Sequence, residues 1–154
     1  MKIEASELPT ITLTLERKED YEFTVRVDGT SVPDFIADEG PPLGESRGPS
    51  PEVLLGAATA SCLSSSLLFC LNKARVPVEQ LTARVGITMV RNERARLRVG
   101  SMKIVINAQV PDDRRDRFER CRELFEDYCV VTESVRHGIP IEVEATASSD
   151  TEGR

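Results

Sequence analysis

Hydrophobic and polar residues alternate along the first part of the chain, as they do in strands that have one face against a core. Two alternating stretches, 8–17 and 21–27, flank a polar turn at 18–20 and predict a β-hairpin. An Asp-Gly pair at 28–29 supplies a second turn before a short strand at 32–37. We therefore expect the chain to open with a three-stranded meander.

A helix signal follows this meander. Residues 38–50 are rich in Gly, Pro and Ser, which predicts a long surface loop. Ser50 is a favourable N-cap and Pro51 is favoured at the first helical position, so a helix should begin here and run to about Lys73. Its apolar residues cover most of its circumference, which is typical of a helix buried on nearly all sides. This helix is the predicted core element.

The second half of the chain predicts another hairpin, a helix and a last strand. Stretches 81–91 and 97–110 alternate and flank a charged turn. Residues 112–128 carry apolar side chains three and four apart, which predicts a helix with one face inward. After a short turn or helix at 130–136, alternation over 139–145 predicts a final strand.

These elements indicate an α+β fold in one domain, residues 1–147, followed by a disordered tail at 148–154. A chain of 154 residues can bury a full core without a disulfide or a metal. The net charge of -6 disfavours nucleic acid and anionic membranes as partners, because both need basic patches. Residues 1–10 lack a signal pattern and no long uninterrupted apolar run is present, so we expect a cytoplasmic protein.

The four cysteines are the residues best suited to carry chemistry. None lies in a Cys-x-x-Cys pair and His137 is the one histidine of the sequence, so neither a metal site nor another cofactor is expected. A Cys-His pair has weak support, because His137 lies beside Gly138 at the end of a turn. Without a signal pattern, thiols are expected rather than a disulfide framework.

Cys62 differs from the other cysteines in its neighbours. Small or hydroxylated side chains lie about one turn away on the same helix, at positions 58, 59, 65 and 66. They leave room for a peroxide, and hydroxyls can lower the pKa of a thiol by hydrogen-bonding its thiolate. The residues alone leave open that Cys62 is an inert core side chain. Cys70 and Cys121 lie on apolar stripes and are expected as small core residues.

Two motifs resemble the signature of the OsmC/Ohr family. In the first, Pro51-Glu52 opens the predicted central helix and Cys62 follows ten residues after the glutamate. In the second, Asp127-Tyr-Cys129-Val-Val-Thr-Glu-Ser precedes Gly138-Ile-Pro-Ile141, which is similar to the family's second-cysteine segment and the strand after it. Together with the order of elements, the resemblance extends over about residues 8–146.

The resemblance implies an OsmC-like fold and an intertwined homodimer with two sites at its interface. It also implies reduction of organic hydroperoxides. Cys62 would be the peroxidatic cysteine, which attacks the peroxide and becomes a sulfenic acid, and Cys129 the resolving cysteine that forms a disulfide with it. An external thiol reductant would then restore both thiols.

The family also uses a glutamate and an arginine. Glu52 would be the glutamate, and ten helical residues place it roughly 15 Å from Cys62, so it would have to reach the site from the partner subunit. Arg47 in the loop is the first candidate for the arginine and Arg26 the alternate, because Pro42 stands where one subgroup places it.

Two alternatives remain. A homodimer of the same fold could bind a small hydrophobic ligand in an apolar interface pocket without catalysis. A structural dimer with incidental thiols would keep Cys62 and Cys129 far apart. The distance between these two thiols therefore separates the last alternative from the others.

Overall fold

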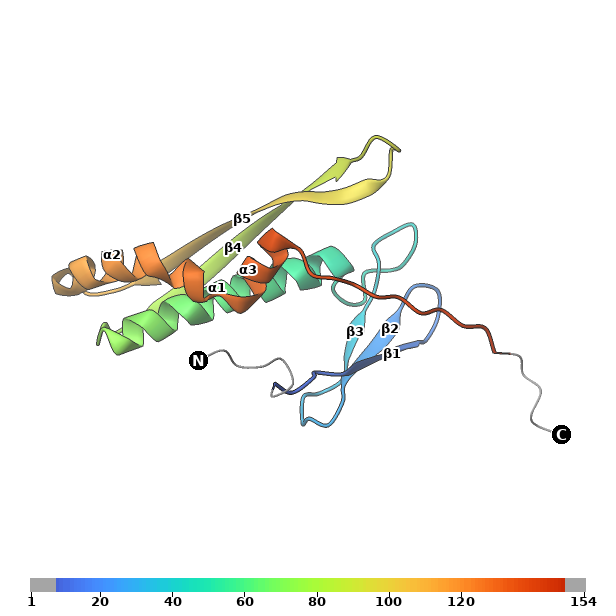
Figure 1. The fold of residues 1–154 in the computed structure, drawn as a ribbon, viewed down its shortest axis with the longest axis horizontal. Coiled ribbons are helices and arrows are strands. Elements are labelled where there is room, and N and C mark those ends of the chain that lie inside the picture. Colours follow the sequence, from blue (N-terminus) through green and yellow to red (C-terminus); the bar gives the residue numbers. More distant parts are fainter. Residues whose placement is uncertain (1–7, 149–154) are drawn as a thin grey trace.

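The computed structural model describes residues 8–148, and its strands form two separate antiparallel sheets (Figure 1). The first sheet contains β1 (Leu13–Arg17), β2 (Phe23–Val27) and β3 (Phe35–Ala37) in that order. Val25, opposite Leu15 and Phe35, is buried at its centre. The predicted meander is therefore confirmed.

The second sheet is a long two-stranded ribbon. It is formed by β4 (Gln80–Arg91) and β5 (Leu97–Gln109), as the alternation predicts, with a register shift between Thr88 and Met89. In Figure 1 the ribbon runs beside the central helix and extends beyond it. The described residues make few contacts between the three-stranded sheet and this ribbon or the central helix. One chain thus contains two weakly connected parts.

The central helix α1 (Pro51–Lys73) begins and ends as predicted. Ser50 caps it by accepting a hydrogen bond from the backbone N–H of Val53 at 3.5 Å. One face packs inward against β4 and β5, and its buried residues are Gly56, Thr59, Ala60, Leu63, Leu67 and Leu71. The opposite face is open, because Val53 is 52% and Phe69 60% exposed. The expectation of burial on nearly all sides is therefore wrong for a single chain, whose other elements cover one side of α1.

By length and composition α1 could also cross a membrane, with a hydropathy of 1.8 over its most apolar window. In the structure it packs against β4, β5 and the helices that follow them. A core helix of a globular domain has the same length and composition. We interpret α1 as such a core helix.

The helices after the ribbon pack along α1. The predicted helix at 112–128 is present in three pieces: a 3₁₀ turn η2 (Asp112–Arg114), α2 (Arg115–Leu124) and a second 3₁₀ turn η3 (Phe125–Tyr128). A short helix α3 (Val130–His137) follows, and Gly138 ends it with a positive φ of 79°. A core cluster of Leu67, Leu71, Val76 and Cys121 joins α2 to the end of α1.

The last strand predicted at 139–145 is absent from the described part of the chain. The segment leaves α3 as an extended, exposed stretch (Figure 1), with Ile141 83% and Val143 85% exposed. Its alternation is that of a strand, yet neither sheet of the same chain pairs with it, and a strand needs a hydrogen-bonded neighbour. Most of the predicted disordered tail, residues 149–154, lies outside the described residues.

Candidate active site

The structure brings Cys62 and Cys129 together from two helices. Cys62 lies midway along α1 and is half-buried, whereas Cys129 is the N-cap residue of α3 and is 1% exposed. The two thiols lie close enough to influence each other's pKa, and the backbone N–H of Val131 donates to the Cys62 sulfur at 3.5 Å. The alternative of two incidental, distant thiols does not fit this geometry.

Burial and hydrogen bonding give the two thiols different acidities. Burial, followed by the hydrogen bond with Cys129, raises the pKa of Cys62 above its ordinary value. Burial also acts to raise the pKa of Cys129, but its hydrogen bonds with Cys62 and Thr132 outweigh it and the pKa of Cys129 is lowered. The Thr132 hydroxyl lies 3.0 Å from the Cys129 sulfur. Within one chain, negative charge is therefore more stable on Cys129.

Glu52 lies at the N-terminal end of α1, away from the thiol pair at the middle of the helix. It is half-buried in the first helical turn, ten residues before Cys62. The helix is continuous between them, so the two positions are roughly 15 Å apart along its axis. Glu52 and Cys62 of one chain cannot share a small site.

Arg47 belongs to a cluster of charges on the loop after β3. Its guanidinium lies 2.7 Å from Glu19, 3.3 Å from the buried Glu22 and 2.7 Å from Glu45. The hydrogen bonds that Arg47 donates to Glu45 and then to Glu19 raise the pKa of its guanidinium. Within residues 8–148, Arg47 forms no ion pair with Glu52.

Arg26, the alternate arginine, is also engaged away from the thiols. It forms an ion pair with Asp34 at 3.1 Å, on the three-stranded sheet. Neither arginine is thus assembled with Cys62 inside one chain. The thiol pair is complete in a single chain, and the expected glutamate and arginine are not beside it.

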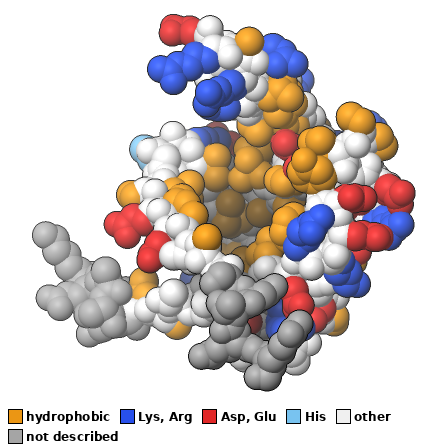
Figure 2. Space-filling model, turned by 90° about the vertical axis from the view of Figure 1, so that its right-hand side faces the viewer, with side chains coloured by type: hydrophobic (Ala, Val, Ile, Leu, Met, Phe, Trp, Pro, Cys, Tyr) orange, Lys and Arg blue, Asp and Glu red, His pale blue; other side chains and the backbone are white. Residues whose placement is uncertain are grey.

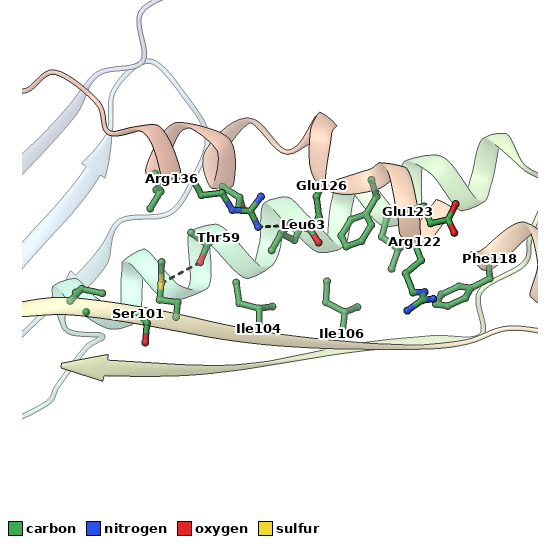
Figure 3. Close-up of a pocket in the computed structure, with 17 residues that line it drawn as sticks. Thr59, Leu63, Ser101, Ile104, Ile106, Phe118, Arg122, Glu123, Glu126 and Arg136 are labelled. Atoms are coloured by element: carbon green, nitrogen blue, oxygen red, sulfur yellow. Dashed lines mark hydrogen bonds and ion pairs between the residues drawn. The ribbon is translucent and has the colours of Figure 1, made fainter. Parts of the chain in front are cut away.

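An open groove of about 720 Å³ with mostly apolar walls is lined in part by Thr132, the residue that contacts the Cys129 sulfur, although neither cysteine lines it. Its walls come from α1, β5, α2 and α3, with Leu63, Ile104 and Ile106 among its apolar side chains (Figure 3). Figure 2 shows a hollow lined by hydrophobic side chains with charged residues around it. Arg136 and Glu126, paired with each other, stand at its edge. The groove could hold an apolar molecule or an apolar side of another chain.

Cys70 and Cys121 form a disulfide between α1 and α2, with their Cα atoms 5.6 Å apart. The expectation that both are unpaired core residues is therefore wrong, although Cys121 is indeed buried in the core cluster. A sequence signal was available: eight residues separate Cys62 from Cys70, and eight separate Cys121 from Cys129. When two antiparallel helical segments face each other in one register, two facing cysteine pairs must be separated by about the same number of residues on each segment.

Among residues 8–148, no cluster of three or more His, Cys, Asp or Glu side chains is arranged to hold a metal ion. Thr132 and the backbone of Val131, which contact the two sulfurs, are site features that sequence reasoning missed. The sequence shows Thr132 three residues after Cys129, which is the spacing of side chains on one helix face.

A family model described as OsmC-like protein matches residues 44–144, a stretch that includes Glu52, both thiols of the pair and the disulfide. No curated protein matches the sequence significantly.

Solved structures share this fold. An OsmC-like protein of unknown function from Vibrio cholerae gives a TM-score of 0.71 at 18% identity, covering 82% of this chain and 94% of that one. An OsmC-like protein from Mycoplasma pneumoniae gives 0.69 at 13% identity, covering 83% and 88%. The organic hydroperoxide resistance protein OhrB of Bacillus subtilis gives 0.59 at 18% identity, covering 82% and 90%. At these identities the likeness concerns the fold.

Proposed function

The chain belongs to the OsmC-like protein family, and from that premise we propose that it is a cytoplasmic thiol peroxidase that reduces organic hydroperoxides through Cys62 and Cys129. The observation that carries this proposal is the contact between these two thiols, which lie on different helices and far apart in the sequence. A hydroperoxide resistance protein among the structures of the same fold supports the same chemistry.

The proposed reaction begins at Cys62, because its sulfur is half-buried and can be reached, whereas Cys129 is enclosed. The Cys62 thiolate attacks a peroxide oxygen, the O–O bond breaks, and the alcohol leaves while Cys62 becomes a sulfenic acid. The Cys129 thiol attacks the sulfenic sulfur, a disulfide forms and water leaves. Two equivalents of an external thiol reduce this disulfide and are oxidised to an external disulfide.

This assignment needs a positive charge near Cys62, because burial raises its pKa in the single chain. We propose that a second copy supplies it, in a homodimer where Arg47 or Arg26, together with Glu52, approaches the thiol of the other chain. The open face of α1 and the unpaired segment 139–145 support such an intertwined dimer. Apolar side chains on both features would then be buried.

Titration of free thiols with cumene hydroperoxide tests the reaction. One equivalent should consume the thiols of Cys62 and Cys129, produce one equivalent of cumyl alcohol and leave a Cys62–Cys129 disulfide in the peptide map. The Cys62→Ser variant should lose turnover, and Cys129→Ser should accumulate a sulfenic acid that dimedone traps. Retention of both thiols after the peroxide is added would exclude this function.

The second candidate is a non-catalytic homodimer that binds a small hydrophobic ligand. The apolar groove of about 720 Å³ favours it, as does the position of Arg47 and Arg26 away from Cys62 in one chain. This candidate predicts that both thiols survive the peroxide, while an apolar fluorophore binds with an affinity that Leu63→Arg, in the groove wall, weakens by tenfold or more.

A further inference from the structure

The second cysteine pair, Cys70 and Cys121, lies along the same contact between α1 and the α2–α3 segment as the proposed site; this contact is called the seam below. Moving eight residues forward along α1 leads from Cys62 to Cys70, and moving eight residues back from Cys129 leads to Cys121. Both pairs therefore obey one antiparallel register between α1 and the α2–α3 segment. We propose that the Cys70–Cys121 disulfide is a permanent staple that fixes this register and so keeps Cys129 against Cys62.

The burial of the seam explains why a staple is needed. Among the described residues of α2, Cys121 is the one that is buried, and η3 contains none. Phe118 and Phe125 are half-buried against the core cluster, so they add packing without locking the position of the segment. Cys129 is the next buried side chain along the chain, so the staple is the covalent link to α1 that stands nearest before it.

The staple is not a second reactive pair. Eight helical residues separate Cys62 from Cys70 by roughly 12 Å, too far for direct exchange between the two pairs. Cys121 is 3% exposed and belongs to the core cluster, which shields its sulfur from reductants, and Cys70 is half-buried against the same cluster. Cys70 and Cys121 thus act as positioning residues, because their disulfide holds Cys129 next to Cys62.

The staple closes by thiol–disulfide exchange with a small-molecule disulfide. The two thiols lose two electrons and two protons as the S–S bond forms, and the small-molecule disulfide is reduced to two thiols. This step needs no peroxide. The role of the staple extends the proposed peroxidase site, but closure of the Cys62–Cys129 bridge can be measured without that activity.

The first experiment determines which cysteines are free. The purified native protein is alkylated in denaturant without reductant and its peptides are mapped. We expect two alkylated residues, Cys62 and Cys129, and a peptide that joins Cys70 to Cys121. Four alkylated cysteines would overturn the proposal. A second measurement uses the wild-type protein, in which oxidised glutathione has first closed a Cys62–Cys129 bridge, and titrates it with reduced glutathione. If the Cys70–Cys121 bond is reduced before the Cys62–Cys129 bond, the proposal is also overturned.

The second experiment measures the effective concentration of the Cys62–Cys129 thiols in glutathione redox buffers. The Cys70→Ala/Cys121→Ala variant should show a tenfold or greater fall, because Cys129 is no longer held in register. The matched control is Val76→Ala, which removes packing from the same core cluster and keeps the staple. It should lower stability yet change the effective concentration less than twofold.

An unchanged effective concentration in the staple-free variant, with native circular dichroism, would overturn the proposal. An equal fall in Val76→Ala would do the same, because it would assign the effect to stability in general. If the wild-type protein does not reduce peroxide but the staple-free variant still shows the tenfold fall, the proposed function is wrong and the proposed role of the staple is supported.

Discussion

The two neighbouring thiols differ in pKa because they have different hydrogen-bond partners. Burial acts to raise the pKa of both thiols and backbone N–H groups at the start of α3 act to lower both, but Cys129 in addition has the Thr132 hydroxyl, and the contact between the thiols lowers the pKa of Cys129 while it raises that of Cys62. Each thiol therefore titrates under the influence of the other. The thiol that a peroxide can reach is the one that a single chain makes less acidic.

Replacing Cys129 should make Cys62 more acidic. In Cys129→Ser, the neighbour that competes for negative charge is gone, and one of the causes that raise the pKa of Cys62 disappears. The pH at which iodoacetamide modifies Cys62 at half its maximal rate should fall relative to the wild type. Thr88→Ser, on the remote ribbon, serves as the control. A midpoint equal to or above that of the wild type would contradict this prediction.

Asp38 should contribute stability that depends on pH. It is buried, and hydrogen bonds from the backbone N–H groups of Arg47, at 3.0 Å, and Glu45, at 3.1 Å, lower its pKa. A lowered folded-state pKa gives stability that is complete above the ordinary carboxyl pKa of about 3.9 and is lost as the pH falls through the lower value.

The Asp38→Asn variant should therefore be less stable than the wild type at pH 7, and the difference should shrink toward pH 3. Urea unfolding at both pH values measures it. Glu93→Gln, on the exposed turn of the ribbon, should leave the profile unchanged. A difference that stays constant with pH would show that the charge of Asp38 is not the cause.

At the scale of elements, the loop between β3 and α1 is held by a close approach of backbones. A Cβ atom on Gly48 would overlap the carbonyl oxygen of Ile36 in β3, and the neighbouring carbonyl carbon at 2.6 Å. Gly48→Ala should therefore displace the loop and cost about 1–3 kcal/mol of unfolding free energy, as overpacking does. Gly40→Ala is the matched control, because its nearest neighbour is the Ser46 hydroxyl at 3.6 Å. Equal unfolding midpoints in urea for both variants would contradict the prediction.

Local signals predicted most elements of this fold. Ser50 and Pro51 mark the start of α1 by their own chemistry, and period-two alternation identifies both hairpins, because these signals need no distant partner. The same alternation failed at 139–145, because within residues 8–148 no strand pairs with this segment. Alternation indicates which side chains are apolar enough to be buried, whereas a strand forms only where a neighbouring strand supplies hydrogen bonds.

The candidate site was less accessible to sequence reasoning. Proximity of Cys62 and Cys129 depends on how two helices slide along each other, which neither helix encodes locally. The same is true of the Cys70–Cys121 bond, which composition favoured as two unpaired thiols. The interactions of Arg47 depend on the fold of a Gly- and Pro-rich loop, for which periodicity carries no information.

At the scale of the whole molecule, the proposed dimer predicts complementation between inactive chains. Cys62→Ser and Glu52→Gln homodimers should each lose most peroxidase activity. If Glu52 serves the thiol of the other chain, a mixed dimer keeps one intact site, and subunit exchange at equal amounts should restore about a quarter of the wild-type activity. Peroxide consumption measured after exchange by partial denaturation and refolding gives the result.

The control for complementation is a mixture of Cys62→Ser with Cys129→Ser. These two residues meet within one chain, and a mixed dimer carries one defect in each site. That mixture should stay inactive in turnover. Restoration in the control, or none with Glu52→Gln, would show that the sites are not shared as proposed.

The common register of the two cysteine pairs also makes the stretch between Cys121 and Cys129 a spacer of fixed length. Adding or deleting one residue in η3, a 3₁₀ turn with about three residues per turn, would rotate everything beyond it by about 120° around the helix axis. The disulfide and the reactive pair could then no longer both face α1. Natural or engineered length variation in this family member should therefore be tolerated in the loop at 38–50 and on the ribbon tip, and be selected against in this short spacer.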